Sequence, residues 1–204
     1  MSQESLVTLQ QAFDERRSVY ALGNELPVAP QAIINMAERV LLHTPSAFNS
    51  QSSRLVVLFG DEHQKLWDIA EEKLRAAVGD GDFSGSQQKL DGFRAAAGTV
   101  LFYEDRNVTK SLQEQFALYA ERFPIWAEHA SAMHQYAMWT ELHTLDIGAN
   151  LQHYNPLVDK DAAAAFAIPD SWELIAQMPF GNIKAPAGEK TYEPVNERMK
   201  VLGL

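Results

Sequence analysis

Two short, continuous apolar runs limit the fold more than any other feature of this sequence. Residues 55–59 (Leu-Val-Val-Leu-Phe) and 99–103 (Thr-Val-Leu-Phe-Tyr) are bounded by polar residues and glycine. Runs of this length and composition are typical of strands that are covered on both faces. The segments between and around them have helical spacing, and the intervals are uneven. We therefore expect an α+β domain and not a regular βαβ alternation.

Several segments place apolar residues at helical spacing. The clearest is Pro30–His43, which has a proline in its first turn and a stop at Thr44-Pro45. Asp61 is the expected cap of a helix that follows the first apolar run. The segment from 125 to 146 is apolar almost all round, so we expect a buried helix that Gly148 ends. The expected helices are residues 4–16, 30–43, 62–77, 107–121, 125–146 and 159–166.

The remaining segments are expected to be strands, loops and a tail. We expect strands over residues 149–153 and 174–178, besides the two apolar runs. Residues 79–86 are rich in glycine, aspartate and serine, which predicts a mobile surface loop. The whole chain of 204 residues reads as one domain, with residues 181–204 as a polar C-terminal extension.

Charge and composition exclude several classes of function. With 17 basic and 27 acidic side chains the formal net charge is −10, so a nucleic-acid partner is not expected. No apolar run is long enough for a membrane span, and the N-terminus does not look like a secretory signal, so we expect a cytoplasmic protein. Cysteine is absent, and the six histidines lack metal-ligand spacing, so no metal site is expected.

No common nucleotide fingerprint is present. The chain contains no G-x-G-x-x-G and no G-x-x-x-x-G-K-[ST] motif, and it has no G-x-S-x-G nucleophile elbow. If a nucleotide cofactor binds, other residues must hold its phosphate. Arg16-Arg17-Ser18 is one candidate, because two guanidinium forks and a hydroxyl can grip a phosphate. The alternative is that the two cations only complement a helix dipole.

Two further polar clusters are candidate binding segments. In Pro45-Ser-Ala-Phe-Asn-Ser-Gln51, Asn49 and Gln51 can each donate and accept hydrogen bonds, as the edge of a heterocycle requires. An ordinary turn is the alternative. Polar groups are also concentrated from Gly148 to Pro156, where His153 can titrate near neutral pH or serve as a structural residue. Aromatic residues at 123–126 either wall a pocket or pack two helices together.

Taken together, these motifs resemble the nitroreductase family. The Arg16-Arg17-Ser18-Val19 segment, the Pro-Ser-Ala-Phe-Asn-Ser-Gln loop and the Gly148 turn occur in the family's order and approximate spacing. A short subfamily from bacteria and yeasts is the most similar, through the stretches 44–59, 112–124, 151–156 and 178–190. The resemblance covers nearly the whole chain.

The resemblance implies a nitroreductase-like fold, in which helices surround a mixed or antiparallel central sheet and two chains form an intertwined homodimer. It also implies that each FMN is contacted by both chains and that the C-terminal extension packs on the partner. The expected FMN contacts lie in four segments. They are Arg16, Arg17 and Ser18 with Lys190 at the phosphate and ribityl chain, Asn49 (from the partner) and Gln51 at the ribityl chain or ring edge, and Gln152, His153 and Tyr154 along the ring.

The implied activity is the reduction of quinones or nitroaromatic compounds with NADH or NADPH, by ping-pong hydride transfer. The flavin carries the electrons, so no catalytic side chain is expected. One departure from the family is Asn155-Pro156, where many members have an acidic residue and a glycine whose N–H groups face the flavin; proline has no N–H. This departure keeps open a flavin-binding regulatory or stress-response protein with little turnover. The apolar helix at 125–146 leaves a non-catalytic interaction module as a third hypothesis.

Overall fold

One antiparallel sheet forms the centre of the protein. The computed structural model describes residues 8–204, and its strand order is β1 (Leu22–Gly23), β5 (Trp172–Ile183), β3 (Gly98–Asp105), β2 (Ser53–Phe59), with β4 (Ile147–Ala149) also paired to β5. All of these pairs are antiparallel. The α-helices are α1 (Leu9–Glu15), α2 (Pro30–His43), α3 (Gly60–Val78), α4 (Ser84–Arg94), α5 (Arg106–Gln115), α6 (Phe123–Thr144), α7 (Asp159–Ala165) and α8 (Val195–Arg198).

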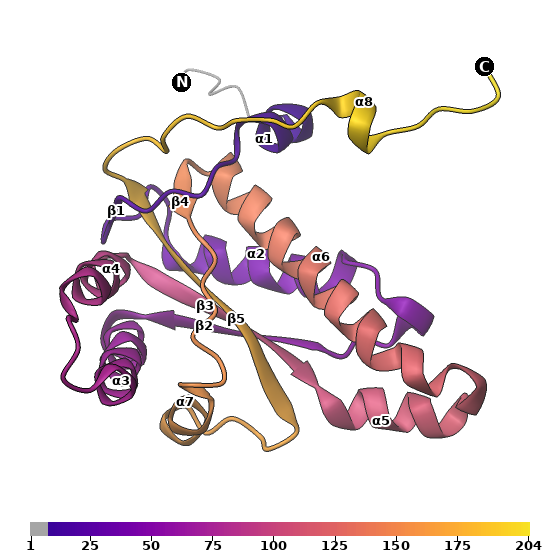
Figure 1. Ribbon diagram of the computed structural model, residues 1–204, viewed down its shortest axis with the longest axis horizontal. Coiled ribbons are helices and arrows are strands. Elements are labelled where there is room, and N and C mark those ends of the chain that lie inside the picture. The colour runs from indigo at the N-terminus through magenta and orange to yellow at the C-terminus, as the bar shows by residue number, and fades with distance from the viewer. Residues whose placement is uncertain (1–7) are drawn as a thin grey trace.

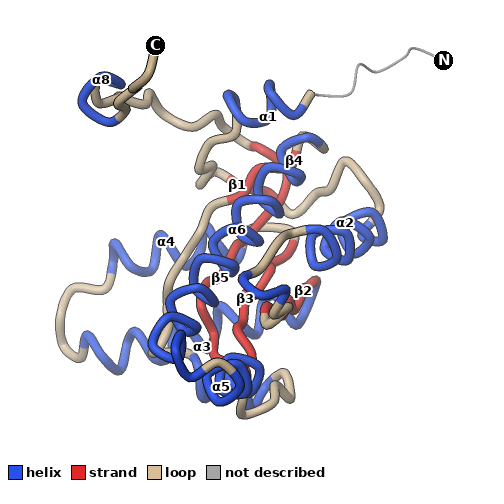
Figure 2. The backbone as a smooth tube through the Cα atoms, turned by 90° about the vertical axis from the view of Figure 1, so that its right-hand side faces the viewer, coloured by secondary structure: helices blue, strands red, loops and turns tan. Residues whose placement is uncertain are grey.

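Helices cover both faces of the sheet, with α2 and α6 on one side and α3, α4 and α7 on the other (Figures 1 and 2). The alternation of β3 shows why the sequence requires this. Val100 and Phe102 pack against α2 and α6, while Leu101 and Tyr103 pack against α3, α4 and α7. Since every one of these side chains is buried, the run is apolar without interruption, as expected for a strand covered on both faces. The α+β prediction is confirmed.

The helix that prolines bound agrees with the sequence prediction, whereas two other helices begin at residues that were not predicted. The helix α2 has the predicted bounds Pro30–His43. The helix expected over 4–16 begins at Leu9, because Thr8 caps it by accepting a hydrogen bond from the Gln11 N–H, and residues 4–7 lie outside the described part. Asp61 was predicted to cap α3, but it lies in the first turn of that helix. Its negative charge there still interacts favourably with the helix dipole.

Other predicted boundaries are wrong. The helix expected over 107–121 ends at Gln115 and is followed by a 3₁₀ helix (Ala117–Arg122). The long helix α6 ends at Thr144, and Gly148 lies inside β4, between Val19, Leu22 and Ile183. The strand expected over 149–153 overlaps β4 at Ala149 alone. After β4, Gln152 forms an isolated bridge to Gln177 of β5. The tail begins after Ile183 and not at Gly181, because β5 continues through both residues.

The helix α4 was not predicted. It begins inside the expected loop 79–86 and presents only Leu90 and Phe93 to the core, so its sequence has little helical signal. Arg94, at its end, holds α4 to α3 through ion pairs with Asp68 and Glu71. These contacts join residues that are far apart in sequence, so no local sequence pattern predicts them.

The C-terminal segment leaves the body of the protein. It runs past α1, forms the short helix α8 and ends away from the other elements (Figure 1). Many of its apolar side chains are exposed, Leu202 to 79%. Within residues 8–204 no helix combines the length and the apolar composition that crossing a bilayer requires.

A buried histidine is expected to make the fold sensitive to mild acid. The His63 ring lies with Nδ1 2.8 Å from Thr99 Oγ1 and Nε2 3.2 Å from the Arg94 carbonyl oxygen, and burial lowers its pKa. The unfolded chain binds a proton near pH 6.5 while the folded ring stays neutral, so the free energy of unfolding should fall as the pH drops below about 6.5. Urea unfolding between pH 7.5 and 5.5 measures this decrease.

The variant His63→Gln provides the control, since glutamine does not titrate. Its free energy of unfolding should be lower than that of the wild type at pH 7.5 but should change less on acidification. A pH dependence identical to that of the wild type would show that His63 does not contribute.

Candidate functional site

The first predicted motif and the C-terminal tail form one open hollow of about 660 Å³. Arg16, Arg17 and Ser18 line one side, and a stretch of the tail from 186 to 190 lines the other. The Nη2 of Arg17 donates a 2.7 Å hydrogen bond to the Gly188 carbonyl oxygen, which fixes the tail against the motif. Lys190 also lines the hollow. Three cations and one carboxylate, that of Glu189, therefore line it in a chain of formal net charge −10.

Arg16 is the least satisfied of these cations. Its Nε and Nη1 atoms are buried and have no hydrogen-bond partner in the structure. The guanidinium lies over two aromatic rings of α6, with Cζ 4.4 Å from the ring centroid of Trp139 and 5.6 Å from that of Tyr136. Buried donors that lack an acceptor are unfavourable, so Arg16 offers donors that a water molecule or an anion would satisfy.

A chain of hydrogen bonds joins this motif to the segment after β4. Ser18 forms a parallel bridge with Ala149, and the Val19 carbonyl accepts a 2.9 Å hydrogen bond from Nδ2 of Asn150. The Oδ1 of Asn150 accepts from Nε2 of Gln152 at 2.8 Å. Gln152 is thus brought beside the motif, through Asn150. The sequence interpretation missed Asn150, although a polar residue between the apolar Ala149 and Leu151 was the available signal.

The buried side chain of Gln177 fixes the same segment from β5. Gln152 and Gln177 exchange two backbone hydrogen bonds of 2.7 and 2.9 Å, and Oε1 of Gln177 accepts from the Tyr154 N–H at 2.7 Å. Gln177 was also missed, because it is the one polar residue of the predicted apolar strand 174–178. It sets the backbone of residues 152–154, while the side chain of His153 remains exposed.

Tyr154 does not join the other predicted site residues. Its ring packs against Trp67 and Phe93, at centroid distances of 5.7 and 6.3 Å. These residues belong to the core beneath α3 and α4, whereas Trp139 and Arg16 lie on the α6 side of the sheet. Burial raises the pKa of the Tyr154 hydroxyl. A tyrosine in this position holds the loop to the core beneath α3 and α4, and its contact with a flavin ring stays a prediction.

The loop with Asn49 and Gln51 has a strained backbone. Phe48, Asn49 and Gln51 have φ values of 56°, 51° and 48°, in the left-handed region that side chains rarely adopt. Ser46 holds them, since its carbonyl accepts from the Asn49 N–H and its Oγ from the Gln51 N–H, both at 3.0 Å. Such strain is concentrated at functional sites. The side chains of Asn49 and Gln51 are exposed.

This loop lies far from Arg16 within one chain. The ring of Phe48 stacks on Trp126 near the start of α6, at a centroid distance of 5.8 Å, and Arg16 lies over Trp139. The helical rise between positions 126 and 139 amounts to about 20 Å. The structure therefore does not place Asn49 and Gln51 in the hollow that Arg16 lines. Phe123 and Trp126 pack against Phe48 and also against Phe116 and Tyr119, which precede α6. The second contact agrees with the interpretation that these aromatic residues pack two helices together.

Comparison with known proteins gives concordant matches. The model of the nitroreductase family matches residues 14–182. Nitroreductase FRM2 of Saccharomyces cerevisiae is 35% identical over 184 residues, which cover 89% of this chain and 91% of that protein.

Solved structures include nitroreductase CinD of Lactococcus lactis in complex with nicotinic acid, at 45% identity, a TM-score of 0.90 and coverage of 96% of this chain and 100% of that chain. A complex of CinD with 4-nitrophenol has a TM-score of 0.88 at 44% identity, with the same coverage. A protein of Desulfovibrio desulfuricans solved with FMN has the same fold, with a TM-score of 0.69, 20% identity and coverage of 96% and 97%.

Proposed function

Because this chain belongs to the nitroreductase family, whose model matches residues 14–182, we propose that it is an FMN-dependent reductase. It is an oxidoreductase by family membership. The proposal goes further in naming NADH or NADPH as the electron donor and a quinone or nitroaromatic compound as the acceptor. The observation that carries it is the unpaired guanidinium of Arg16 at the hollow described above.

The residues of the hollow fit a flavin phosphate. Arg16, Arg17 and Lys190 supply three cations, and Ser18 a hydroxyl, which together are the donor set that a phosphate prefers. Gln152 adds an amide, held by Asn150 and by β5. We assign Gln152 and the exposed His153 to the ring end of the flavin, and Arg16, Arg17, Ser18 and Lys190 to its phosphate and ribityl chain.

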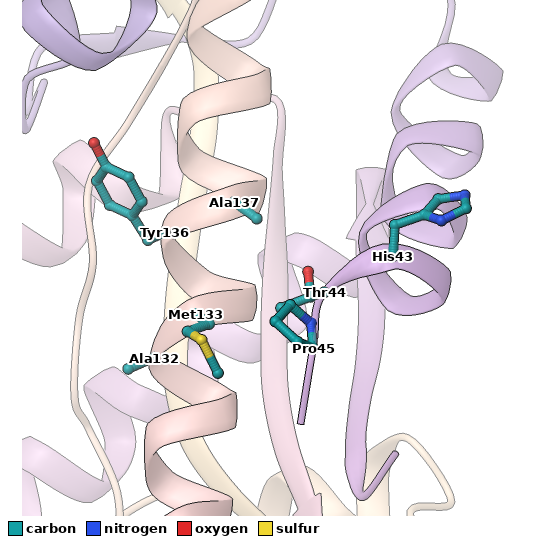
Figure 3. A pocket seen from close by; sticks show the side chains of 7 residues that line it. All are labelled: His43, Thr44, Pro45, Ala132, Met133, Tyr136 and Ala137. Atoms are coloured by element: carbon teal, nitrogen blue, oxygen red, sulfur yellow. The ribbon is translucent and has the colours of Figure 1, made fainter. Parts of the chain in front are cut away.

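A second copy of the chain is required to bring Asn49 beside this site. A hollow of about 590 Å³ lies between the end of α2 and the middle of α6, and it is lined mainly by apolar groups (Figure 3). Met133 and Tyr136 of α6, Phe13 of α1 and Leu42 of α2 are large apolar side chains left exposed. We infer that this face packs on the partner in a homodimer, with Asn49 and Gln51 reaching the partner's FMN. The tail, including residues 184–204, is assigned to the same interface.

The protein's contribution to the reaction is binding and orientation. FMN supplies the hydride chemistry when bound, and no side chain at the site is assigned as an acid or a base. Donor and acceptor are proposed to use the same face of the ring in turn, which predicts ping-pong kinetics. CinD has been solved with 4-nitrophenol and with chloramphenicol, which supports an aromatic acceptor for this relative.

The absorption spectrum of the purified protein tests the proposal. Flavin bands that bleach when NADH or NADPH is added without oxygen, and return with a quinone, are the expected result. A protein that gains no flavin on incubation with FMN would refute it. Bound flavin that stays oxidised would instead favour the flavin-binding regulator, which Pro156 supports because it has no N–H to offer the ring.

Sedimentation of the same sample should give a dimer of the 22.8 kDa chain.

A further inference from the structure

Two aromatic residues of α6 form a shelf beneath the Arg16 guanidinium. Its Cζ lies 4.4 Å from the ring centroid of Trp139 and 5.6 Å from that of Tyr136. A guanidinium within about 6 Å of a ring face is attracted by the ring's quadrupole, and the attraction grows when water is excluded. Tryptophan is the strongest partner of the aromatic residues, and here it is also the nearer one.

The indole of Trp139 is itself held in a fixed plane. Its Nε1–H donates a 3.2 Å hydrogen bond to the Ala149 carbonyl oxygen, and the ring packs beside the apolar core between α6 and the sheet. The same carbonyl oxygen accepts the Val19 N–H at 2.9 Å. Since indole has only one donor, this bond sets the orientation of the ring. The shelf is thus coupled to the backbone that immediately follows Arg16-Arg17-Ser18.

Arg16 is held by aromatic rings and not by an acid. Across residues 8–204 it makes no ion pair, and the nearby carboxylate of Glu15 faces His143, at 4.0 Å. Arg54 is a useful contrast, since it lies over Trp172 at 5.6 Å but is also paired with Asp105 at 3.0 Å. A carboxylate partner neutralises the guanidinium, whereas an aromatic face orients it and leaves its charge for an incoming anion.

We propose that Trp139 is a positioning residue for the phosphate-binding arginine. Its ring holds the Arg16 fork in place before FMN arrives, so that less side-chain freedom is lost on binding. This inference rests on the proposed function, because it requires Arg16 to contact the FMN phosphate. If this inference holds, Trp139 affects only the binding of ligands that carry a phosphate. Riboflavin lacks the phosphate of FMN and is therefore the matched probe.

The test compares the dissociation constants of FMN and riboflavin for the apoprotein of each variant. Trp139→Leu is expected to weaken FMN binding about tenfold and to leave riboflavin binding unchanged. Trp139→Phe keeps a ring face and should stay within about threefold of the wild-type FMN-to-riboflavin ratio. Trp172→Leu removes the other arginine-over-tryptophan contact and should leave the ratio unchanged. In Arg16→Ala protein, adding Trp139→Leu should change the ratio no further.

Two results would overturn the inference. The first is an unchanged ratio in Trp139→Leu, and the second is an equal loss of both ligands, which would show that Trp139 only supports the fold. Should Trp139→Leu fail to fold, Tyr136, which belongs to the face assigned to the partner, provides the second variant. Tyr136→Leu must then lower the ratio in a protein that is still a dimer, or the shelf is refuted. Failure of the proposed function gives a different result from failure of this inference. The wild type would then show no preference for FMN over riboflavin, or Arg16→Ala would leave that preference unchanged.

Discussion

Replacing Arg16 with alanine is expected to weaken FMN binding by roughly 10- to 150-fold. A hydrogen bond that involves a charged group contributes about 1.5–3 kcal/mol, and the loss of that energy corresponds to this change in affinity. Within residues 8–204 Arg16 pairs with no acid and two of its nitrogens have no acceptor, so we expect the phosphate to be its main partner. Titration of the apoprotein with FMN, followed by flavin fluorescence, measures the change.

Two substitutions control this experiment. Arg75→Ala removes an exposed arginine of α3 that pairs with Glu71, on the other side of the sheet, and should leave FMN affinity unchanged. Arg16→Lys keeps the charge but loses the planar fork, so its affinity should lie between those of the wild type and Arg16→Ala. An Arg16→Ala protein that purifies with its normal flavin content would contradict the assignment of Arg16 to the phosphate.

Replacing Gly181 with alanine is expected to damage both the fold and the site. A Cβ at this position would lie 2.0 Å from the Gly23 carbonyl oxygen and 3.0 Å from the Ala97 nitrogen, which are backbone atoms with little freedom to move. Overpacking of this kind costs about 1–3 kcal/mol, and occasionally more. The strand β1 must then separate from β5, and the Arg16-Arg17-Ser18 motif leads directly into β1. We therefore expect a lower free energy of unfolding and weaker FMN binding together.

Gly92→Ala is the matched control, because the same methyl group is added where nothing lies within 4 Å. This glycine is inside α4, so alanine should stabilise the protein by about 0.5–1 kcal/mol and leave FMN binding unchanged. Urea unfolding and FMN titration of both variants separate the two cases. If Gly181→Ala unfolded at the same urea concentration as the wild type, the close approach of β1 to β5 would be refuted.

The sequence predicted those elements whose limits depend on local chemistry. The helix α2 begins with Pro30 and ends before Pro45, and both prolines act through their own ring geometry. The run in β3 is apolar without interruption because both faces are covered, so the sequence alone indicates a buried strand. By contrast, the polar end of β3 is strand only because other strands pair with it, β2 and β5 with Glu104 and β5 with Asp105. No local pattern specifies such a partner.

The site was predictable only in part, for the same physical reason. Arg16, Arg17 and Ser18 are adjacent in sequence, so their shared donor chemistry is visible without a structure. Their contact with the tail around Lys190 was suggested by family resemblance, and the structure places these residues at one hollow. The buried amides of Asn150 and Gln177 acquire a role only through partners in other segments. The ring of Tyr154 packs on Trp67 beneath α3, and the sequence does not show to which side of the sheet a loop side chain turns.

The position of β5 has a consequence for synthesis on the ribosome. This strand pairs with β1, β3 and β4, yet it occupies residues 172–183 of a chain of 204. The first 171 residues therefore emerge without the strand that joins the sheet, and the apolar edge of β3 has no partner on that side until β5 is made. Pairing of segments so distant in sequence is slow, and exposed strand edges are prone to aggregate. Until β5 is made, the sheet of the nascent protein stays open, a state in which binding by a chaperone is most useful.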